Sequence, residues 1–251
     1  MNQAQFYEKN GYCIIKGVLN EQQIETMQKA TDEVIASVKR AKEDHSFLWG
    51  GKWLSEELRQ ALNINGVHDT QFHSSDFAKL LVNSDAVYDV VEQIIGPNIQ
   101  LHHTKLIVKP PETGAPFPMH QDYPYFPHEK HTMLAAMFHF GNATIENGCL
   151  RVVPESHKLG PLPTQPDGLY LDPQKYPIEG AMPCEVNAGD VVLFSYLTIH
   201  GSGLNNSNRP RRNWLVQMRS ADDLPTVETH LSRGQGMMLR GIDPLVRITH
   251  L

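Results

Sequence analysis

The chain has 251 residues, of which 40% are hydrophobic and 20% charged, and these ordinary globular values exclude a disordered or fibrous chain. Its formal net charge of -6, with acidic and basic residues mixed along the sequence, argues against a nucleic-acid-binding protein. The sequence contains no apolar run long enough to cross a membrane, and MNQAQFYEKN lacks the basic and apolar pattern of a secretory leader. Three widely spaced cysteines, Cys13, Cys149 and Cys184, are typical of reduced core thiols, so we expect an unprocessed cytoplasmic protein.

The first part of the chain, up to about residue 96, is predicted to be mainly helical. A β-rich run over residues 11–19 precedes Asn20, which forms a capping-box pattern with Gln23. Apolar residues then recur at helical spacing over residues 20–39. A second helix is predicted over residues 84–96, where Gly96 fits the C-cap position.

From about residue 97 to 223 the sequence consists of β-type runs separated by Pro, Gly and Asn clusters. The runs are NIQLHHTKLIVKPP, HTMLAAMFHF, GCLRVVP, GDVVLFSYLTIH and RRNWLVQMRS. Helices followed by strands predict one α+β domain over residues 1–251, with a β-sandwich or barrel buttressed by the N-terminal helices and a C-terminal tail over 224–251. The proline-rich stretch 161–183 is a candidate substrate-covering loop.

One tripeptide, His120-Gln121-Asp122, is the sole H-x-[DE] pattern in the chain. With 13 histidines a chance H-x-D is expected about half the time, so the tripeptide alone is weak evidence. In an extended strand, however, residues i and i+2 project from the same face. Two histidines and one carboxylate suit non-haem Fe(II), and His200, which ends the apolar run GDVVLFSYLTIH, is the best third ligand. Zinc is less natural, because the usual cysteine spacings are absent.

An arginine follows shortly after His200 and offers a planar fork for a dicarboxylate. Alternation along the strand RRNWLVQMRS puts Arg212 on one face with Trp214, and Arg211 on the other face with Gln217. Hydrophobicity favours Arg212 inside a packed core, whereas a polar, ligand-holding interior favours Arg211. Periodicity does not decide between them.

Several motifs in order resemble the phytanoyl-CoA dioxygenase family. They are HTKLIVKPPETG, HQDYPYFPH, ENGCLRVVPESHK, GDVVLFSYLTIHGSG and RRNWLVQMRSAD. The resemblance runs from about residue 99 to 223, and the opening FYEKNGYCIIKGVLNEQQI is also similar. It implies a double-stranded β-helix (jelly-roll) enzyme that binds Fe(II) and uses 2-oxoglutarate and O2 as co-substrates to hydroxylate an organic compound.

Matched position by position, the resemblance implies that His120, Asp122 and His200 are the iron ligands. It further implies that Arg211 holds the distal carboxylate of 2-oxoglutarate and that the Ser202 hydroxyl assists it. Lys105 and Phe138 fall where the family enzyme acting on phytanoyl-CoA carries a methionine and a tryptophan, and we expect both beside the cofactor.

The substrate is expected to be a small molecule. Tyr123, Tyr125 and Phe126 follow the metal motif and are candidates to line an apolar pocket, although core packing is an equally good interpretation for each. Lys105 and Lys109 are expected in solvent unless they meet an anion. The acidic net charge makes a small organic acid or other metabolite at least as good a candidate as an acyl-CoA. Two other functions remain open, a metal-binding sensor without turnover and a metal-dependent hydrolase or isomerase.

Overall fold

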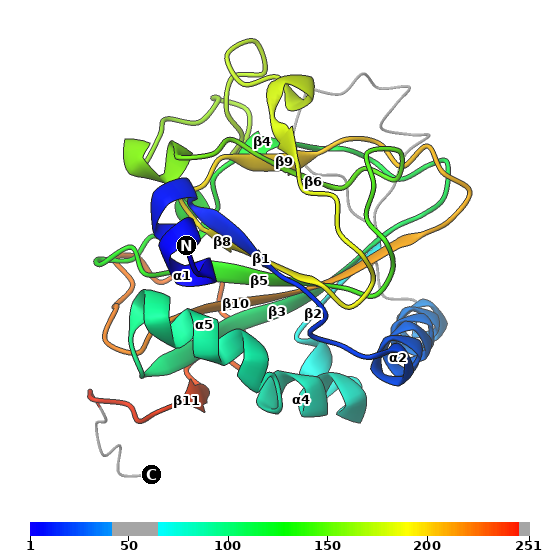
Figure 1. Ribbon diagram of the computed structural model, residues 1–251, viewed down its shortest axis with the longest axis horizontal. Helices are drawn as coiled ribbons and strands as arrows, with labels where there is room; N and C mark the ends of the chain where they lie inside the picture. Colours follow the sequence, from blue (N-terminus) through cyan, green and yellow to red (C-terminus); the bar gives the residue numbers. More distant parts are fainter. Residues whose placement is uncertain (42–64, 246–251) are drawn as a thin grey trace.

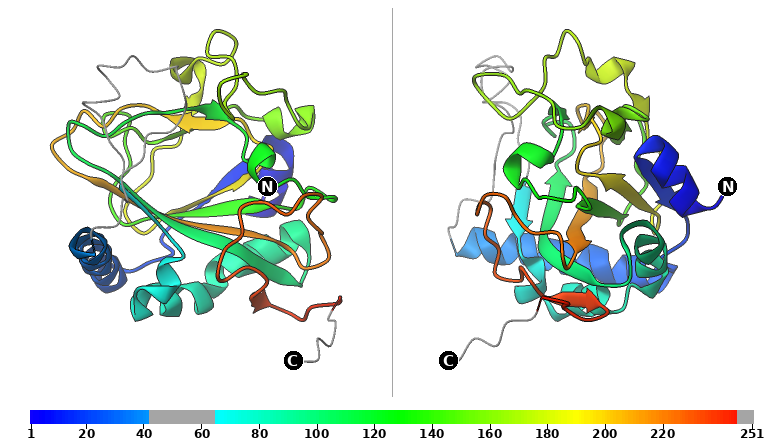
Figure 2. Two further views of the ribbon diagram at one scale, coloured as in Figure 1. Left: turned by 180° about the vertical axis from the view of Figure 1, so that it is seen from behind. Right: turned by 90° about the vertical axis from the view of Figure 1, so that its left-hand side faces the viewer.

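The computed structural model describes residues 1–41 and 65–245 of the chain. Two antiparallel sheets face each other, and helices cover the outer side of the larger one (Figures 1 and 2). In order, the large sheet contains β1 (Tyr12–Ile15), β8 (Val191–Ser195), β5 (Leu134–His139), β10 (Arg211–Ser220), β3 (Ile99–Lys109) and β11 (Met238–Arg240), and β2 (Asn65–His68) also pairs with β3. The small sheet contains β4 (Phe117–His120), β9 (His200–Ser202), β6 (Leu150–Val152) and β7 (Met182–Pro183). This is the predicted α+β double-stranded β-helix.

The described helices precede the main strands, as predicted. They are α1 (Gln3–Asn10), α2 (Glu21–Arg40), α4 (Ser75–Val82) and α5 (Asp85–Ile95). The capping box is confirmed, because the Gln23 backbone N–H donates to the Asn20 side chain and the Asn20 N–H to the Gln23 side chain, each at 2.9 Å. The C-cap at Gly96 is also confirmed, with a φ of 91° that other residues rarely adopt. Among the described residues, no helix combines the length and the apolar character that a membrane span requires.

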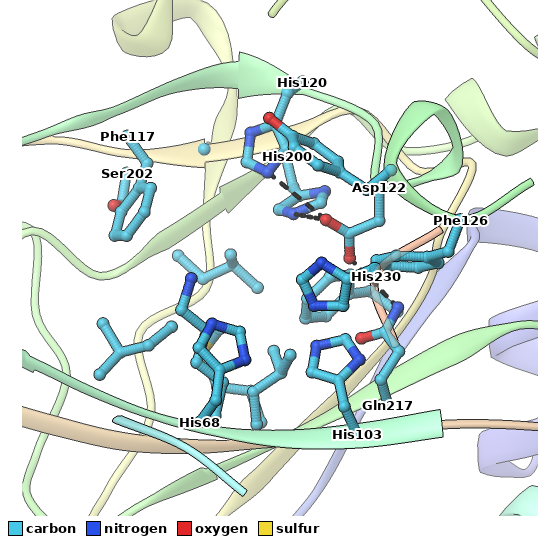
Figure 3. Close-up of a pocket in the computed structure, with 18 of the residues that line it drawn as sticks. His68, His103, Phe117, His120, Asp122, Phe126, His200, Ser202, Gln217 and His230 are labelled. Carbon is cyan, nitrogen blue, oxygen red and sulfur yellow. Dashed lines mark hydrogen bonds and ion pairs between the residues drawn. The ribbon is translucent and has the colours of Figure 1, made fainter. Parts of the chain in front are cut away.

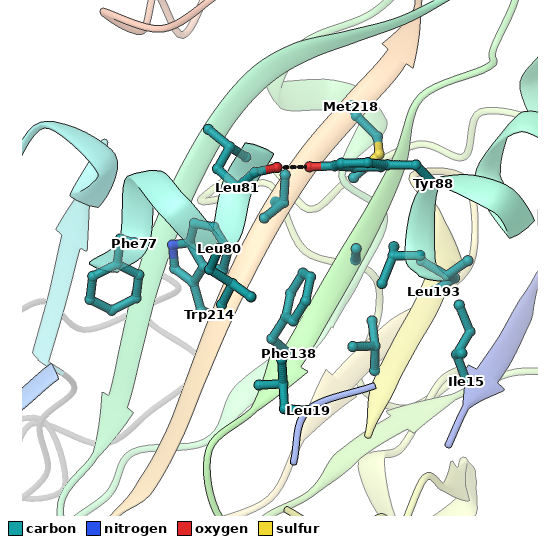
Figure 4. Close-up of a cluster of buried hydrophobic side chains, with 14 of the residues drawn as sticks. Ile15, Leu19, Phe77, Leu80, Leu81, Tyr88, Phe138, Leu193, Trp214 and Met218 are labelled. Atoms are coloured by element: carbon teal, nitrogen blue, oxygen red, sulfur yellow. Dashed lines mark hydrogen bonds between the residues drawn. The ribbon is translucent and has the colours of Figure 1, made fainter. Parts of the chain in front are cut away.

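Strict alternation along β10 separates the face of the large sheet that packs on the helices from the face that looks toward the small sheet. Trp214, Val216 and Met218 point toward the helices and join the main hydrophobic core (Figure 4). The Trp214 indole N–H donates to Thr70 Oγ1 at 2.7 Å, so its one polar atom is satisfied inside the core. Arg212 lies on the same face and forms a bidentate ion pair with Asp32 of α2 at 2.9–3.0 Å. The opposite face, which carries Arg211, looks toward the small sheet.

The run GDVVLFSYLTIH is not one strand, as the sequence suggested. It forms β8, which ends at Ser195, and then a turn leads into β9, which begins at His200 in the other sheet. The turn closes because Thr198 N–H donates to the Ser195 carbonyl at 2.9 Å and Leu197 N–H to Ser195 Oγ at 3.2 Å. A third bond, from Thr198 Oγ1 to the Gly11 carbonyl at 2.7 Å, ties the turn to the start of β1. This turn places His200 in the small sheet, beside β4.

The segment 161–183 packs on the outside of the small sheet. Leu171 and Ala181 are buried there against Met119 and Ile199, and β7 pairs with β6. No residue of this segment lines the cavity described below. The expectation of a substrate-covering loop is therefore not supported by its position, because its apolar side chains complete a core behind the sheet.

Cys13, Cys149 and Cys184 are buried free thiols, as expected.

Candidate active site

Two histidines meet across the pairing of β4 and β9. His120 ends β4 and lies directly opposite His200, the first residue of β9, with ring centroids 4.2 Å apart. Asp122 follows just past the end of β4 in a helical backbone conformation, and its N–H donates to the Tyr196 carbonyl at 2.9 Å. Its Oδ1 lies 3.5 Å from His120 Nε2 and 3.7 Å from His200 Nε2 (Figure 3). The three residues converge through this turn, not through the strand alternation that the sequence suggested.

Hydrogen bonds fix which ring nitrogens face the centre of the triad. His120 Nδ1 lies 2.7 Å from the Pro118 carbonyl, and His200 Nδ1 lies 2.9 Å from the Thr198 carbonyl. Because a carbonyl only accepts, both Nδ1 atoms donate, and both Nε2 lone pairs point toward Asp122. Gln217 of β10 donates to Asp122 Oδ2 at 3.3 Å and orients the carboxylate.

The protonation states of the triad suit a cation. Burial, followed by the neighbouring His120, lowers the pKa of His200 to about 4, so this imidazole is neutral at pH 7. Burial alone would raise the pKa of Asp122, but the two adjacent imidazoles and the Gln217 amide lower it below its usual value. Two imidazole nitrogens and one carboxylate oxygen, all buried and within 4.8 Å of one another, form the donor set that fits Fe(II) in non-haem oxygenases.

Two buried cations face the same interior. Arg211 is 3% exposed and Lys109 is 0% exposed, and the two residues pair directly across β10 and β3. Lys109 Nζ donates to Ser202 Oγ at 2.7 Å and to the Gly203 carbonyl, and the Arg211 guanidinium donates to the Gly148 carbonyl. Neither cation has a carboxylate within ion-pair distance in the described part of the chain. The expectation that Lys109 lies in solvent is wrong.

Burial and mutual repulsion act on these two cations. Burial, followed by the nearby Arg211, holds the pKa of Lys109 well below its usual value, and burial lowers the pKa of Arg211 to about 10. Buried charges are normally paired, and two like charges side by side without a counter-ion form an anion-binding site by default. A planar guanidinium with an ammonium and a hydroxyl beside it suits a carboxylate.

The triad and Arg211 line one cavity of about 230 Å³ between the sheets. Tyr125, Phe126 and Ser202 also line it, and so does Lys105, for which the sequence left both solvent and the cofactor site open. Burial lowers the pKa of Lys105 to about 8. The remaining lining residues are His68, His103, Ile107, Phe117, Met137, Leu150, Phe194, Gly201, Leu215, Gln217 and His230.

Two expected residues do not reach this cavity. Phe138 points to the other side of the large sheet, where its ring centroid lies 5.3 Å from that of Trp214, because residues of β5 alternate and its neighbour Met137 takes the cavity side. The assignment of Phe138 to the cofactor site is therefore wrong. Tyr123 begins a short 3₁₀ turn and packs on Tyr196, with ring centroids 5.6 Å apart, outside the lining of the cavity.

Sequence reasoning missed three histidines in the lining. His68 lies in β2 and His230 in the C-terminal tail, and neither segment carries a motif that points to a site. His103 lies in β3 on the same face as Lys105 and Ile107, which also line the cavity. A β-bulge at His102 puts Leu101 on the opposite face, in the core.

A double-stranded β-helix with a buried His-Asp-His triad at its cavity defines the class of non-haem iron oxygenases. Comparison with known proteins places the chain within this class. Residues 7–213 match the family model described as phytanoyl-CoA dioxygenase (PhyH). The chain is 30% identical over 243 residues to the peroxisomal phytanoyl-CoA dioxygenase of Rattus norvegicus, covering 88% of this chain and 69% of the relative.

Other relatives differ in the compound that they are named for. A probable alpha-ketoglutarate-dependent hypophosphite dioxygenase of Stutzerimonas stutzeri is 32% identical over 155 residues, covering 58% of this chain and 54% of the relative. Among solved structures, EctD from S. alaskensis with 2-oxoglutarate and 5-hydroxyectoine shares the fold, with a TM-score of 0.73 and 21% identity over 95% of this chain and 85% of that chain. The epimerase SnoN from nogalamycin biosynthesis, in complex with Fe³⁺ and alpha ketoglutarate, has a TM-score of 0.71 and 24% identity over 95% and 94%.

The chain belongs to the phytanoyl-CoA dioxygenase family and is an Fe- and 2-oxoglutarate-dependent dioxygenase.

Proposed function

We propose that this protein hydroxylates an aliphatic C–H bond of a small organic acid or other small metabolite. One O2 and one 2-oxoglutarate are consumed, one oxygen atom enters the substrate as hydroxyl, and the other enters succinate, with release of CO2. The observation that carries the proposal is the shared cavity, which the His120-Asp122-His200 triad and the buried cation Arg211 line together. A carboxylate-bearing co-substrate and an iron ion would therefore lie side by side.

The chain's own residues would hold and orient the reactants. His120 Nε2, Asp122 Oδ1 and His200 Nε2 would bind Fe(II) on one face, which leaves the remaining positions for exchangeable ligands. Bound iron supplies the O2 chemistry that side chains cannot. The carbonyls of Pro118 and Thr198 keep the two rings in the metal-binding tautomer, and Gln217 holds the carboxylate.

The distal carboxylate of 2-oxoglutarate would bind to Arg211, with Ser202 and Lys109 beside it. Lys109 already donates to Ser202 Oγ at 2.7 Å, so the hydroxyl proton is available to donate to the anion. Arg211 at one site and the triad at the other fit a molecule with a carboxylate at one end and a chelating keto acid at the other. Charge neutralisation would relieve the repulsion between the two cations.

The size of the cavity supports a small substrate. Its volume of about 230 Å³ must hold 2-oxoglutarate as well, whereas pockets for drug-sized ligands usually measure about 300–1,000 Å³. Tyr125 and Phe126 supply aromatic surface at the cavity, and Lys105 supplies a cation beside it. We propose these residues as the substrate contacts. An acyl-CoA substrate would need its nucleotide outside this volume.

The first test is anaerobic reconstitution with Fe(II) and 2-oxoglutarate, monitored by the weak visible charge-transfer band of the chelate. The band should be lost in His200→Ala and weakened in Arg211→Met, whereas Arg212→Met, an arginine on the opposite face, should retain it. Succinate release with panels of free acids and acyl-CoA thioesters would then identify the substrate class. Stoichiometric iron binding without any band would contradict the proposal and favour a sensor or a hydrolase.

A further inference from the structure

Three histidines outside the iron triad form a second cluster in the same cavity. The ring nitrogens of His68, His103 and His230 that could bind a metal all lie within 4.8 Å of one another. The cluster lies on the side of the cavity formed by β2 and β3 and by the tail, facing the iron triad on the small sheet (Figure 3). The ring centroids of His103 and His230 are 4.5 Å apart, and those of His68 and His230 are 5.4 Å apart.

Three separate segments have to meet to build this cluster. Alternation along β3 sets His103 on the cavity side with Lys105, and the pairing of β2 with β3 sets His68 opposite Lys105. The tail is fastened to the end of β2 by Asp69, which accepts from Ser232 Oγ at 2.6 Å and from the Arg233 N–H at 3.1 Å. Asp69, which directly follows His68, thus holds in place the tail segment that carries His230.

The backbone is strained where the cluster is held. Asp69 has a φ of 54° and His230 a φ of 52°, in the left-handed region that residues with a Cβ rarely adopt. Such strain persists only where surrounding contacts enforce it, and it is concentrated at functional sites. Here the strained backbone directs the His230 imidazole toward the other two rings.

The donor set is suited to a transition-metal ion. Neutral imidazole is a preferred ligand of Zn²⁺ and of its neighbours in the first transition row. His103 Nδ1 lies 2.8 Å from His102 Nδ1, which leaves His103 Nε2 for an ion and provides an outer hydrogen bond to the ring. Buried His103 and the two exposed rings keep one side of the cluster open to an ion from solvent.

Charged side chains of both signs surround the cluster. Lys105 faces all three rings and disfavours a cation, whereas Asp69 faces His68 and His230, and Asp122 faces His230. Burial makes Lys105 give up its proton more readily than an exposed lysine. The two carboxylates thus offset part of the Lys105 charge at His68 and His230.

We propose that His68, His103 and His230 form a second metal site, which binds one divalent transition-metal ion of the Zn²⁺ type independently of the iron triad. Three protein nitrogens leave a fourth tetrahedral position open. Because the cluster lines the cavity, that position is available to water or to an oxyanion of a molecule in the cavity. The site does not depend on turnover or on the identity of the substrate.

The test uses a His120→Ala/His200→Ala variant of the full chain, in which the iron triad is disabled. Titration with Zn²⁺ by calorimetry should show one equivalent bound, and Co²⁺ should give the intense visible bands of a tetrahedral site. Adding His230→Ala, or in a separate variant His68→Ala, should abolish both signals. His73→Ala removes an exposed histidine outside the cluster and should leave both unchanged.

Two outcomes would overturn the proposal. One is the absence of Zn²⁺ binding and of Co²⁺ bands in the triad variant, provided that its far-UV circular dichroism matches the wild type. The other is one equivalent of Zn²⁺ that survives loss of His68 or His230. Should the triad variant fail to fold, the wild type and His230→Ala are compared directly, and the proposal requires two equivalents of Zn²⁺ in the first and one in the second.

Discussion

The buried Lys109 allows a prediction in which stability and affinity change in opposite directions. Lys109→Met keeps an unbranched side chain, shorter by one heavy atom, and removes the charge. Lys109 is fully buried and pairs across the sheet with Arg211, and within residues 1–41 and 65–245 it donates only to Ser202 and the Gly203 carbonyl. Replacing a buried charge by an apolar group of similar volume is often stabilising, here by about 1–3 kcal/mol in the free energy of unfolding.

The affinity for 2-oxoglutarate should fall in the same variant. A hydrogen bond that involves a charged group contributes about 1.5–3 kcal/mol, so loss of the Lys109 charge next to Ser202 predicts a 2-oxoglutarate Kd about 10- to 150-fold higher. Urea unfolding of the metal-free protein measures the first quantity, and anaerobic titration of the charge-transfer band measures the second. Lys16→Met, a change at an exposed lysine, serves as the control and should alter neither.

The pH dependence of the same variant has a defined sign. Because the pKa of Lys109 is well below its usual value in the folded protein, the unfolded chain binds one more proton between that lowered pKa and about 10.4. Stability of the wild type therefore rises with pH in this window, and Lys109→Met lacks that contribution. The extra stability of Lys109→Met over the wild type should be largest at the acidic end of this window and should disappear toward pH 10. A variant that is less stable than wild type, with an unchanged 2-oxoglutarate Kd, would refute the reasoning and leave Lys109 a purely structural role.

Three further substitutions test neighbouring assignments. Gln217→Leu removes the amide that orients Asp122 and should weaken Fe(II) binding about 10- to 100-fold in a competition assay with a chelator, and unchanged affinity would show that the carboxylate needs no support. Phe138→Ala should cost about 3–5 kcal/mol in urea unfolding but leave the 2-oxoglutarate Kd of the folded protein within about twofold, and a larger rise in Kd would restore this residue to the cofactor site. Arg212→Met breaks a partly exposed ion pair and should cost at most about 1 kcal/mol, with no change in the charge-transfer band, whereas loss of the band would place the wrong arginine in the cavity.

The local features of this fold could be read from the sequence where one segment alone determines them. The capping box at Asn20 and the C-cap at Gly96 involve residues within one turn of each other, and the structure confirms both. The alternation along β10 was also readable, although periodicity could not say which face was the interior. The core decides this, because Trp214 and its neighbours need the apolar surface of the helices, which leaves Arg211 for the cavity.

Features that depend on pairing between distant segments could not be predicted. The break between Ser195 and His200 depends on a bond to Gly11, and the opposite faces taken by Leu101 and His103 depend on a bulge opposite β10. His230 reaches the cavity only because the tail bonds to Asp69. Phe138 was assigned by analogy to another protein's residue, and one position along a strand is enough to place a side chain on the opposite face.

The pairing of β3 with β10 explains why the cavity is suited to an anion. Like charges directly opposite each other on neighbouring strands are destabilising, yet the register sets Arg211 opposite Lys109 in the interior. A shift of the register by one residue would relieve this contact but would turn Trp214 away from the helices and bury Arg212. The large apolar core therefore enforces the repulsion between the two cations. A dicarboxylate that binds between them removes that repulsion. The repulsion therefore lowers the stability of the ligand-free protein and, by the same contact, increases the affinity for the anion.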